Sequence, residues 1–132
     1  MIGKMQTMRL MQNLIHKIFI IEKLQQYDIW LADLNPARGS IPGKIRPVVI
    51  IQSNILNKYS ISTVVCPITS NVLINHELLR VFINKGQLDI DSDILVDHIR
   101  TIENKKLIKK ISRLNFEQIK KIKKNLMIVL DL

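Results

Sequence analysis

Residues 46–53 read Arg46-Pro47-Val48-Val49-Ile50-Ile51-Gln52-Ser53, and this dense run of β-branched residues decides the fold class. Such side chains favour strands, and Pro47, which has no amide hydrogen to donate, is tolerated only near the start of a strand or on a sheet edge. Four further strand patterns are present, over residues 27–34, 61–68, 77–83 and 93–99. Short strands at this spacing, without long helices between them, predict a small antiparallel barrel or sandwich.

A helix is predicted to close the chain. Asn115 is a suitable N-cap, and Gln118 stands three residues later, as in a capping box. One face of the helix is apolar, formed by Phe116, Ile119, Ile122, Leu126, Val129 and Leu130. The opposite face is basic, formed by Lys120, Lys121, Lys123 and Lys124. We expect a core-packed helix with a solvated basic face rather than a specific binding site.

The first 26 residues are predicted to form an extension that precedes a single domain of residues 27–132. Residues 4–24 have a helical pattern, with an apolar stripe at Met8, Met11, Ile15 and Ile18. Two interpretations stay open for this segment. It is either an amphipathic helix that packs on the body or on a partner, or the result of a start codon assigned too far upstream.

The composition bounds the class of protein. With 132 residues, 47% of them hydrophobic, the chain has enough apolar material for the core of one domain. No stretch approaches the roughly 18 apolar residues of a membrane span, so we predict no membrane partner. The single cysteine, Cys66, excludes an internal disulfide and any multi-cysteine metal site, and fits a reducing cytoplasm. Cys66 lies within an apolar strand pattern and is predicted to fill the core, whereas Trp30 is predicted to be a core or interface aromatic.

The net charge of +9 is distributed unevenly along the chain. Residues 27–100 hold seven basic and seven acidic side chains, whereas residues 101–132 hold nine basic and three acidic ones. A basic excess of this size predicts a polyanion or an acidic protein as partner.

Three motif-like segments do not support the chemistry that they resemble. Residues 76–80 begin like a zinc-protease motif, but Arg80 stands where the second histidine ligand would be. Asp89, Asp91 and Asp93 begin like a calcium loop but lack its glycine and its last glutamate, so a solvated acidic turn is expected. Residues 39–44 resemble a phosphate-binding loop that is one residue short and precedes a strand. We therefore expect neither a metal nor any other cofactor.

Polar side chains cluster at the ends of the predicted strands. Arg46 precedes a proline, which restrains its backbone to an extended conformation and gives its side chain a defined direction. The other groups are Ser40 and Lys44 before that strand, Thr69 and Ser70 after the next, and Asp97, His98 and Arg100 at the end of residues 93–99. If these strands are neighbours, a guanidinium, a hydroxyl, a carboxylate and an imidazole converge on one rim.

The order of these segments resembles the MazF/PemK-type toxins. The resemblance is carried by Tyr27-Asp28-Ile29-Trp30-Leu31-Ala32-Asp33-Leu34-Asn35-Pro36, Gly39-Ser40, Gly43-Lys44-Ile45-Arg46-Pro47-Val48-Val49-Ile50, Cys66-Pro67-Ile68-Thr69-Ser70, Asp97-His98-Ile99-Arg100-Thr101-Ile102 and Ile128-Val129-Leu130-Asp131-Leu132. It spans the chain from about Tyr27 to Leu132 and leaves the first 26 residues outside.

The resemblance implies an SH3-like β-barrel with a C-terminal helix that acts as a homodimer. It also implies a metal-independent endoribonuclease, which cuts single-stranded RNA within short motifs by attack of the ribose 2′-hydroxyl and is inhibited by a cognate antitoxin. In this family the positions of Arg46 and Thr69 are catalytic. An acidic, extended antitoxin segment is expected to cover Arg46, because a site that receives phosphates also receives carboxylates.

The remaining site residues carry open alternatives. Asp97 aligns with an acidic position that some relatives use for acid–base work or RNA contact. His98 replaces a common glutamine, and supplies either a titrating group or another hydrogen-bonding side chain. Lys44 and Arg100 are expected phosphate contacts, with solvated surface charge as the alternative, and Ser40 and Ser70 are expected RNA contacts.

Two other functions stay open at this point. One is a non-catalytic toxin of the same fold, like the gyrase-poisoning CcdB group, and the other is a basic SH3-like nucleic-acid-binding module. The pairing of Arg46 with Thr69 argues against the first, because that pair has no evident role in gripping a protein.

Overall fold

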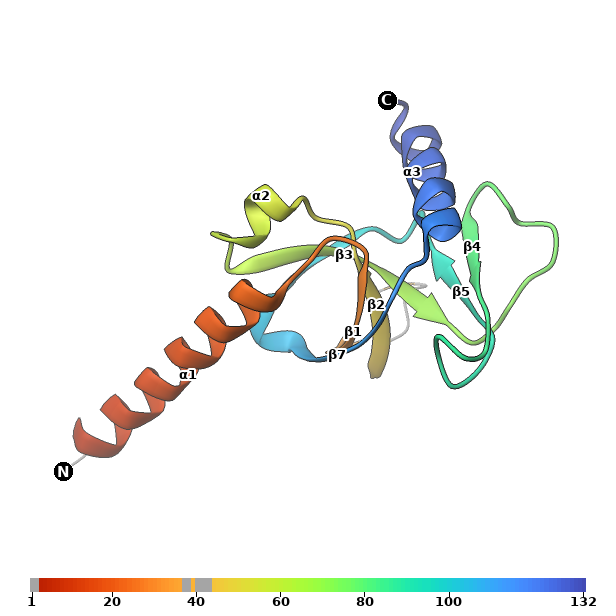
Figure 1. Ribbon diagram of the computed structural model, residues 1–132. Coiled ribbons are helices and arrows are strands. Elements are labelled where there is room, and N and C mark those ends of the chain that lie inside the picture. Colours follow the sequence, from red (N-terminus) through yellow and green to blue (C-terminus); the bar gives the residue numbers. More distant parts are fainter. Residues whose placement is uncertain (1–2, 37–38, 40–43) are drawn as a thin grey trace.

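The computed structural model describes residues 3–36, 39 and 44–132 (Figure 1). In chain order the elements are α1 (Gly3–Lys23), β1 (Asp28–Asp33), β2 (Ile45–Ile50), α2 (Asn54–Asn57), β3 (Ser62–Thr69), β4 (Arg80–Ile83), β5 (Ser92–Leu95), β6 (Arg100–Glu103), the 3₁₀ turn η1 (Asn104–Lys106), β7 (Leu107–Arg113) and α3 (Phe116–Leu130). The predicted class, an antiparallel β fold closed by a C-terminal helix, is confirmed.

The strands form one antiparallel sheet that curls into a barrel-like shape. The order is β4-β5-β3-β2-β1-β7, and β6 pairs with the first half of β3. The strands β7-β1-β2-β3-β6 would be about 19 Å wide if they lay flat, at about 4.8 Å per strand. The chain passes from Glu103 at the end of β6 to Leu107 at the start of β7 in four residue steps, which span at most about 14 Å. This part of the sheet must therefore curve back on itself, as Figure 1 shows.

The apolar run of β2 is continuous because both of its faces are buried. Val48 and Ile50 belong to a cluster that includes Trp30 and Val65, whereas Val49 belongs to a second cluster with Cys66. Successive strand residues point to opposite faces, so a strand buried on both sides needs no polar alternation. The predicted core roles of Cys66 and Trp30 are confirmed, since these side chains are 0% and 2% exposed.

Helix α3 begins as its sequence predicts. The Asn115 side chain accepts a hydrogen bond from the Gln118 amide, and the Gln118 side chain accepts one from the Asn115 amide, each at 2.9 Å. Ile122 is buried against the second cluster, with Ile119, Leu126 and Val129 partly buried beside it. Phe116 and Leu130, which the apolar face was expected to include, are instead exposed at the two ends of the helix.

Helix α1 does not pack on the body along its length. Figure 1 shows it extending away from the sheet, and Met8, Met11 and Ile15 are more than half exposed. Of the alternatives open for this segment, packing on the body is not seen for these three side chains. Leu24, just after the helix, is 2% exposed and belongs to the same cluster as Trp30.

Three local features differ from the sequence prediction. Strand β7 and helix α2 were not predicted. The strand expected at residues 93–99 ends at Leu95 as β5, and after a turn a separate strand, β6, begins at Arg100 and pairs with a different part of β3. Asp93 is not part of a solvated turn: it is 2% exposed, because its carboxylate pairs with Arg80.

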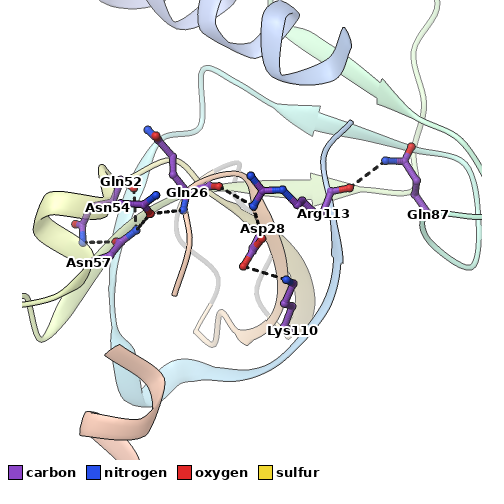
Figure 2. Close-up of polar contacts among 8 residues, drawn as sticks. All are labelled: Gln26, Asp28, Gln52, Asn54, Asn57, Gln87, Lys110 and Arg113. Atoms are coloured by element: carbon purple, nitrogen blue, oxygen red, sulfur yellow. Dashed lines mark hydrogen bonds and ion pairs between the residues drawn. The ribbon is translucent and has the colours of Figure 1, made fainter. Parts of the chain in front are cut away.

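Buried and half-buried polar groups hold the edges of the fold (Figure 2). Asp28 on β1 is fully buried and pairs with Arg113 at 2.8 Å and with Lys110 at 3.4 Å, both on β7. Beside them, Gln52 donates to Asn57 of α2 at 2.9 Å and to the carbonyl of Ser62, the first residue of β3, at 3.3 Å. In the described part of the chain, no helix is long and apolar enough to cross a membrane.

Candidate functional site

The register of β2 and β3 places Arg46 and Thr69 opposite each other. The ladder pairs Val48 with Pro67, and Ile50 with Val65. Continued by two residues, the same register sets Arg46 against Thr69. Directly opposed residues of antiparallel strands have their side chains on the same face, so the guanidinium and the hydroxyl lie on one face of the sheet. Both residues are half-buried.

Arg46 is held from its other side as well. On β1 its partner is Ala32, whose side chain is completely buried. The Leu34 amide donates to the Lys44 carbonyl at 2.9 Å, which fixes the point where the chain enters β2. Lys44 itself is exposed and has a φ of 70°. Lys44 is therefore an exposed cation two residues before Arg46, at the entrance of the strand.

Thr69 ends β3 in a hydroxyl turn. Its Oγ1 accepts a hydrogen bond from the Asn71 amide at 3.1 Å. Threonine and serine hydroxyls commonly bond the amide two residues ahead, and the turn so formed ends a strand. Because a hydroxyl has two lone pairs and one hydrogen, this bond leaves the Thr69 O–H group able to donate.

A groove of about 970 Å³ runs beside this pair of residues. Its walls are the start of β2, the end of β3, the loop of residues 85–92 and part of β7. The charged side chains that line it are Lys44, Arg46, Lys85, Lys109 and Asp89. Arg46 is one of the lining residues, whereas Thr69 is not, although both of its neighbours, Ile68 and Ser70, are. The groove is thus basic, with a net charge suited to a polyanion.

The expected convergence of all the polar groups on one rim does not occur in the single chain. Arg100 pairs with Val65, four residues before Thr69, which corresponds to about 13 Å along β3. The reason is that β5 ends at Leu95 and the chain turns before β6 begins. Asp97 and His98 lie in that turn, where Asp97 Oδ1 and His98 Nε2 are 3.9 Å apart. The structure therefore brings Lys44, Arg46, Thr69 and Ser70 together and leaves the other three aside.

Ser40 lies outside the described residues. Sequence reasoning also missed Lys109 and Lys85 as groove residues. Lys109 lies on β7, and the sequence of that strand, Leu-Ile-Lys-Lys-Ile-Ser-Arg, has only one buried residue and so gave little strand signal. Lys85 lies in the loop between β4 and β5, and no local pattern indicates which way a loop residue faces.

Cys66 is not a reactive group. Burial raises the pKa of its thiol to about 12, and the negative charge of Asp97 contributes in the same direction. The thiol therefore stays protonated at neutral pH, as expected for a residue that fills the core. Within the described ranges, no three His, Cys, Asp or Glu side chains are grouped so that they could hold a metal ion.

Comparison with known proteins identifies relatives of the body of the chain. The family model described as "PemK-like, MazF-like toxin of type II toxin-antitoxin system" matches residues 25–130. Endoribonuclease MazF of Staphylococcus saprophyticus is 40% identical over 101 residues, which are 75% of this chain and 84% of that protein.

Two solved structures show the same fold at low sequence identity. MazF from Deinococcus radiodurans superposes with a TM-score of 0.71 at 15% identity, covering 83% of this chain and 97% of that one. A mycobacterial endoribonuclease in complex with its cognate antitoxin superposes with a TM-score of 0.69 at 16% identity, covering 83% and 96%.

Proposed function

Because this chain belongs to the PemK-like, MazF-like toxins of type II toxin–antitoxin systems, we propose that it is an endoribonuclease that cuts single-stranded RNA. The relative that is 40% identical carries the name endoribonuclease. Within this chain, the observation that carries the proposal is the register that opposes Arg46 and Thr69, together with the basic groove that Arg46 lines.

The proposed chemistry uses the RNA itself as the nucleophile. The ribose 2′-hydroxyl loses its proton and attacks the adjacent phosphorus, while the bond from phosphorus to the 5′-oxygen breaks and that oxygen takes up a proton. The products are a 2′,3′-cyclic phosphate and a 5′-hydroxyl end. Negative charge builds on the phosphoryl oxygens in the transition state, and the Arg46 guanidinium and the Thr69 hydroxyl stabilise it. This route needs no metal ion.

The groove supplies the binding energy for the RNA backbone. Lys44, Lys85 and Lys109 line it together with Ser70, and Asp89 is the one carboxylate among its charged lining residues in the described part of the chain. We propose that the lysines contact phosphates and that the loop of residues 85–92 reads bases in a short preferred motif. Arg100, whose partner Val65 lies about 13 Å from Thr69 along β3, and Asp97 and His98 in the turn before it are proposed to contact flanking nucleotides rather than the scissile phosphate.

Two protein partners complete the proposal. One is a second copy of the chain, which would form a homodimer as in the family that the sequence resembles. The other is a cognate antitoxin with an acidic, extended segment that covers Arg46 and the groove lysines. In its support, a mycobacterial structure of the same fold is a complex of an endoribonuclease with its antitoxin.

The test is to incubate the purified chain with a long single-stranded RNA in EDTA and to map the new ends. We expect cleavage at a few short motifs, with cyclic phosphate and 5′-hydroxyl termini, and no cleavage by the Arg46→Ala variant. Intact RNA would contradict the proposal. If intact RNA were accompanied by inhibition of gyrase, the non-catalytic alternative would be favoured, and binding without cleavage would favour the nucleic-acid-binding module.

A further inference from the structure

The loop that follows Thr69 is fastened by a buried ion pair. Arg80 Nη1 lies 3.1 Å from Asp93 Oδ2, and the two side chains are 17% and 3% exposed. The same Asp93 oxygen accepts a hydrogen bond from the Leu73 amide at 3.0 Å. Arg80 Nη1 also donates to the Asn71 carbonyl at 2.8 Å. Two main-chain groups of this loop are therefore held by one pair of side chains.

The strand order places this ion pair next to the proposed site. Asp93 on β5 is paired directly with Thr69 on β3, and on its other side with Phe82 on β4. Arg80 begins β4 and reaches across to Asp93 from there. The pair therefore links β4 to β5 at the level of the sheet where Thr69 ends β3.

The ion pair bears on the Thr69 hydroxyl through Asn71. The Asn71 amide donates to Thr69 Oγ1 at 3.1 Å, while the Asn71 carbonyl is held by Arg80. Fixing one peptide group of Asn71 restrains the other, because both are attached to the same α-carbon. The amide then occupies one lone pair of the hydroxyl and restricts its rotamer, so that the O–H bond has a limited set of directions.

We propose that Arg80 and Asp93 are positioning residues, which orient the Thr69 hydroxyl through Asn71. This inference rests on the proposed catalytic function of Thr69. A buried ion pair is often no more stabilising than neutral side chains of similar size. The inference therefore gives this pair a role other than stabilising the fold. Preorganisation of a donor, by contrast, is what transition-state stabilisation requires.

The test uses the double variant Arg80→Gln/Asp93→Asn. It removes the guanidinium that donates to the Asn71 carbonyl without leaving an unpaired buried charge, and the new amide oxygen at position 93 can still accept from the Leu73 amide. In single-turnover cleavage of an oligonucleotide that contains the mapped motif, we expect the maximal rate to fall about tenfold and the half-saturating RNA concentration to change less than about twofold. The matched control neutralises the exposed pair of Lys105 and Glu103, 3.3 Å apart, as Lys105→Gln/Glu103→Gln and should cleave normally.

The same double substitution in a Thr69→Val background distinguishes positioning from folding. If Arg80 and Asp93 act through the Thr69 hydroxyl, replacing them has no further effect on cleavage once that hydroxyl has been removed. The triple variant should then cleave at the same rate as Thr69→Val. An equal loss in both backgrounds would overturn the proposal, as would normal cleavage by the double variant. Normal cleavage by Thr69→Val alone would instead contradict the proposed catalytic role of Thr69, while leaving the proposed endoribonuclease activity in place.

Amide hydrogen exchange tests, independently of catalysis, whether the ion pair restrains the loop that follows Thr69. We expect the Asn71 amide to exchange faster in the double variant, while the Leu73 amide, whose acceptor at position 93 is kept, and amides in the centres of β2 and β3 keep their protection. Unchanged exchange at Asn71 would overturn the proposal whatever the chemistry. Should the double variant fail to fold, Arg80→Lys keeps the charge opposite Asp93 and is measured by both methods.

Discussion

Two threonines of strand β3 lie on the same face of the strand in contrasting surroundings. Thr63 is completely buried, and its hydroxyl donates to the side chain of Asn104, which in turn donates to the Ser60 carbonyl at 2.9 Å. Thr69 is half-buried, and its hydroxyl accepts from Asn71 without being enclosed. The Thr63 hydroxyl uses its hydrogen in a bond inside the buried core, whereas the Thr69 hydroxyl can still donate its hydrogen to a ligand. Burial, not residue type, separates the stabilising threonine from the proposed catalytic one.

Removal of the Arg46 side chain, which lies opposite Thr69, should have the largest effect on cleavage. We expect Arg46→Ala to lower the cleavage rate by about 100- to 1000-fold, since one preorganised donor in a transition state is typically worth this much. The melting temperature should change little, because Arg46 is only half-buried at the entrance of β2. Cleavage within about threefold of the unmodified chain would contradict the assigned role.

Thr69→Val keeps the β-branched shape and removes the hydroxyl. The cleavage rate is expected to fall at least about tenfold, because the transition state loses one hydrogen-bond donor. The free energy of unfolding should change by less than about 1 kcal/mol, since this hydroxyl is not enclosed. Chemical denaturation and single-turnover cleavage of the same preparation provide both values, and a silent substitution would reduce Thr69 to a structural strand end.

Thr63→Val makes the same chemical change and should produce the opposite result. It leaves a buried acceptor on Asn104 without its donor, which costs about 1–3 kcal/mol of stability. The cleavage rate per folded molecule should stay within about twofold of normal, because the substitution lies six residues from Thr69, about 20 Å along the strand. A selective loss of cleavage with normal stability would erase the distinction between the two threonines.

The thiol of Cys66, halfway along β3, predicts how the stability of the fold depends on pH. Its pKa is raised from 9.0 to about 12 in the folded chain, so the folded state holds the proton more tightly than the unfolded state. The resulting stabilisation is fully present below pH 9 and is lost as the pH rises toward 12. We expect the unfolding free energy to fall more steeply over this range than in Cys66→Val, as measured by urea denaturation. Equal slopes of the unfolding free energy against pH in the two proteins would mean that the thiol is not shielded from solvent.

Removal of residues 1–22 should have the smallest effect. The exposed part of α1 contributes little to the core, whereas Leu24 is buried and Gln26 donates to the Ile51 carbonyl at 2.9 Å. We therefore propose that the domain begins near residue 23 rather than at Tyr27. The shortened chain should cleave RNA and unfold as the full chain does. A matched deletion of residues 1–26 should lose stability, because it removes Leu24 as well.

The sequence predicted the fold class from strands that are buried on both faces, and the family from motifs in their right order. It also predicted the α3 cap, because a capping box depends on local residues alone. It did not predict β7, whose strand conformation depends on pairing with β1 about 80 residues earlier. It did not predict that Asp93 is buried, because only the register of β4 and β5 brings Arg80 to it.

For the candidate site too, the sequence predicted one part and not the other. The pairing of Arg46 with Thr69 follows from neighbouring strands and a family resemblance, and the register is consistent with it. The separation of Asp97, His98 and Arg100 from that pair depends on a turn inside what reads as one continuous strand. Catalytic and RNA-binding roles stay predictions for all of these residues.

The pairing of β1 with β7 has a consequence for synthesis of the protein on the ribosome. Asp28 has left the exit tunnel long before Arg113, its partner on β7, is made. The wall of the groove that carries Lys109 is thus added only near the end of translation, and α3 follows it. At about 5–20 residues per second, the nascent chain spends several seconds with β1 unpaired on that side. A ribosome that is making this protein therefore carries an incomplete groove until the last part of the chain emerges.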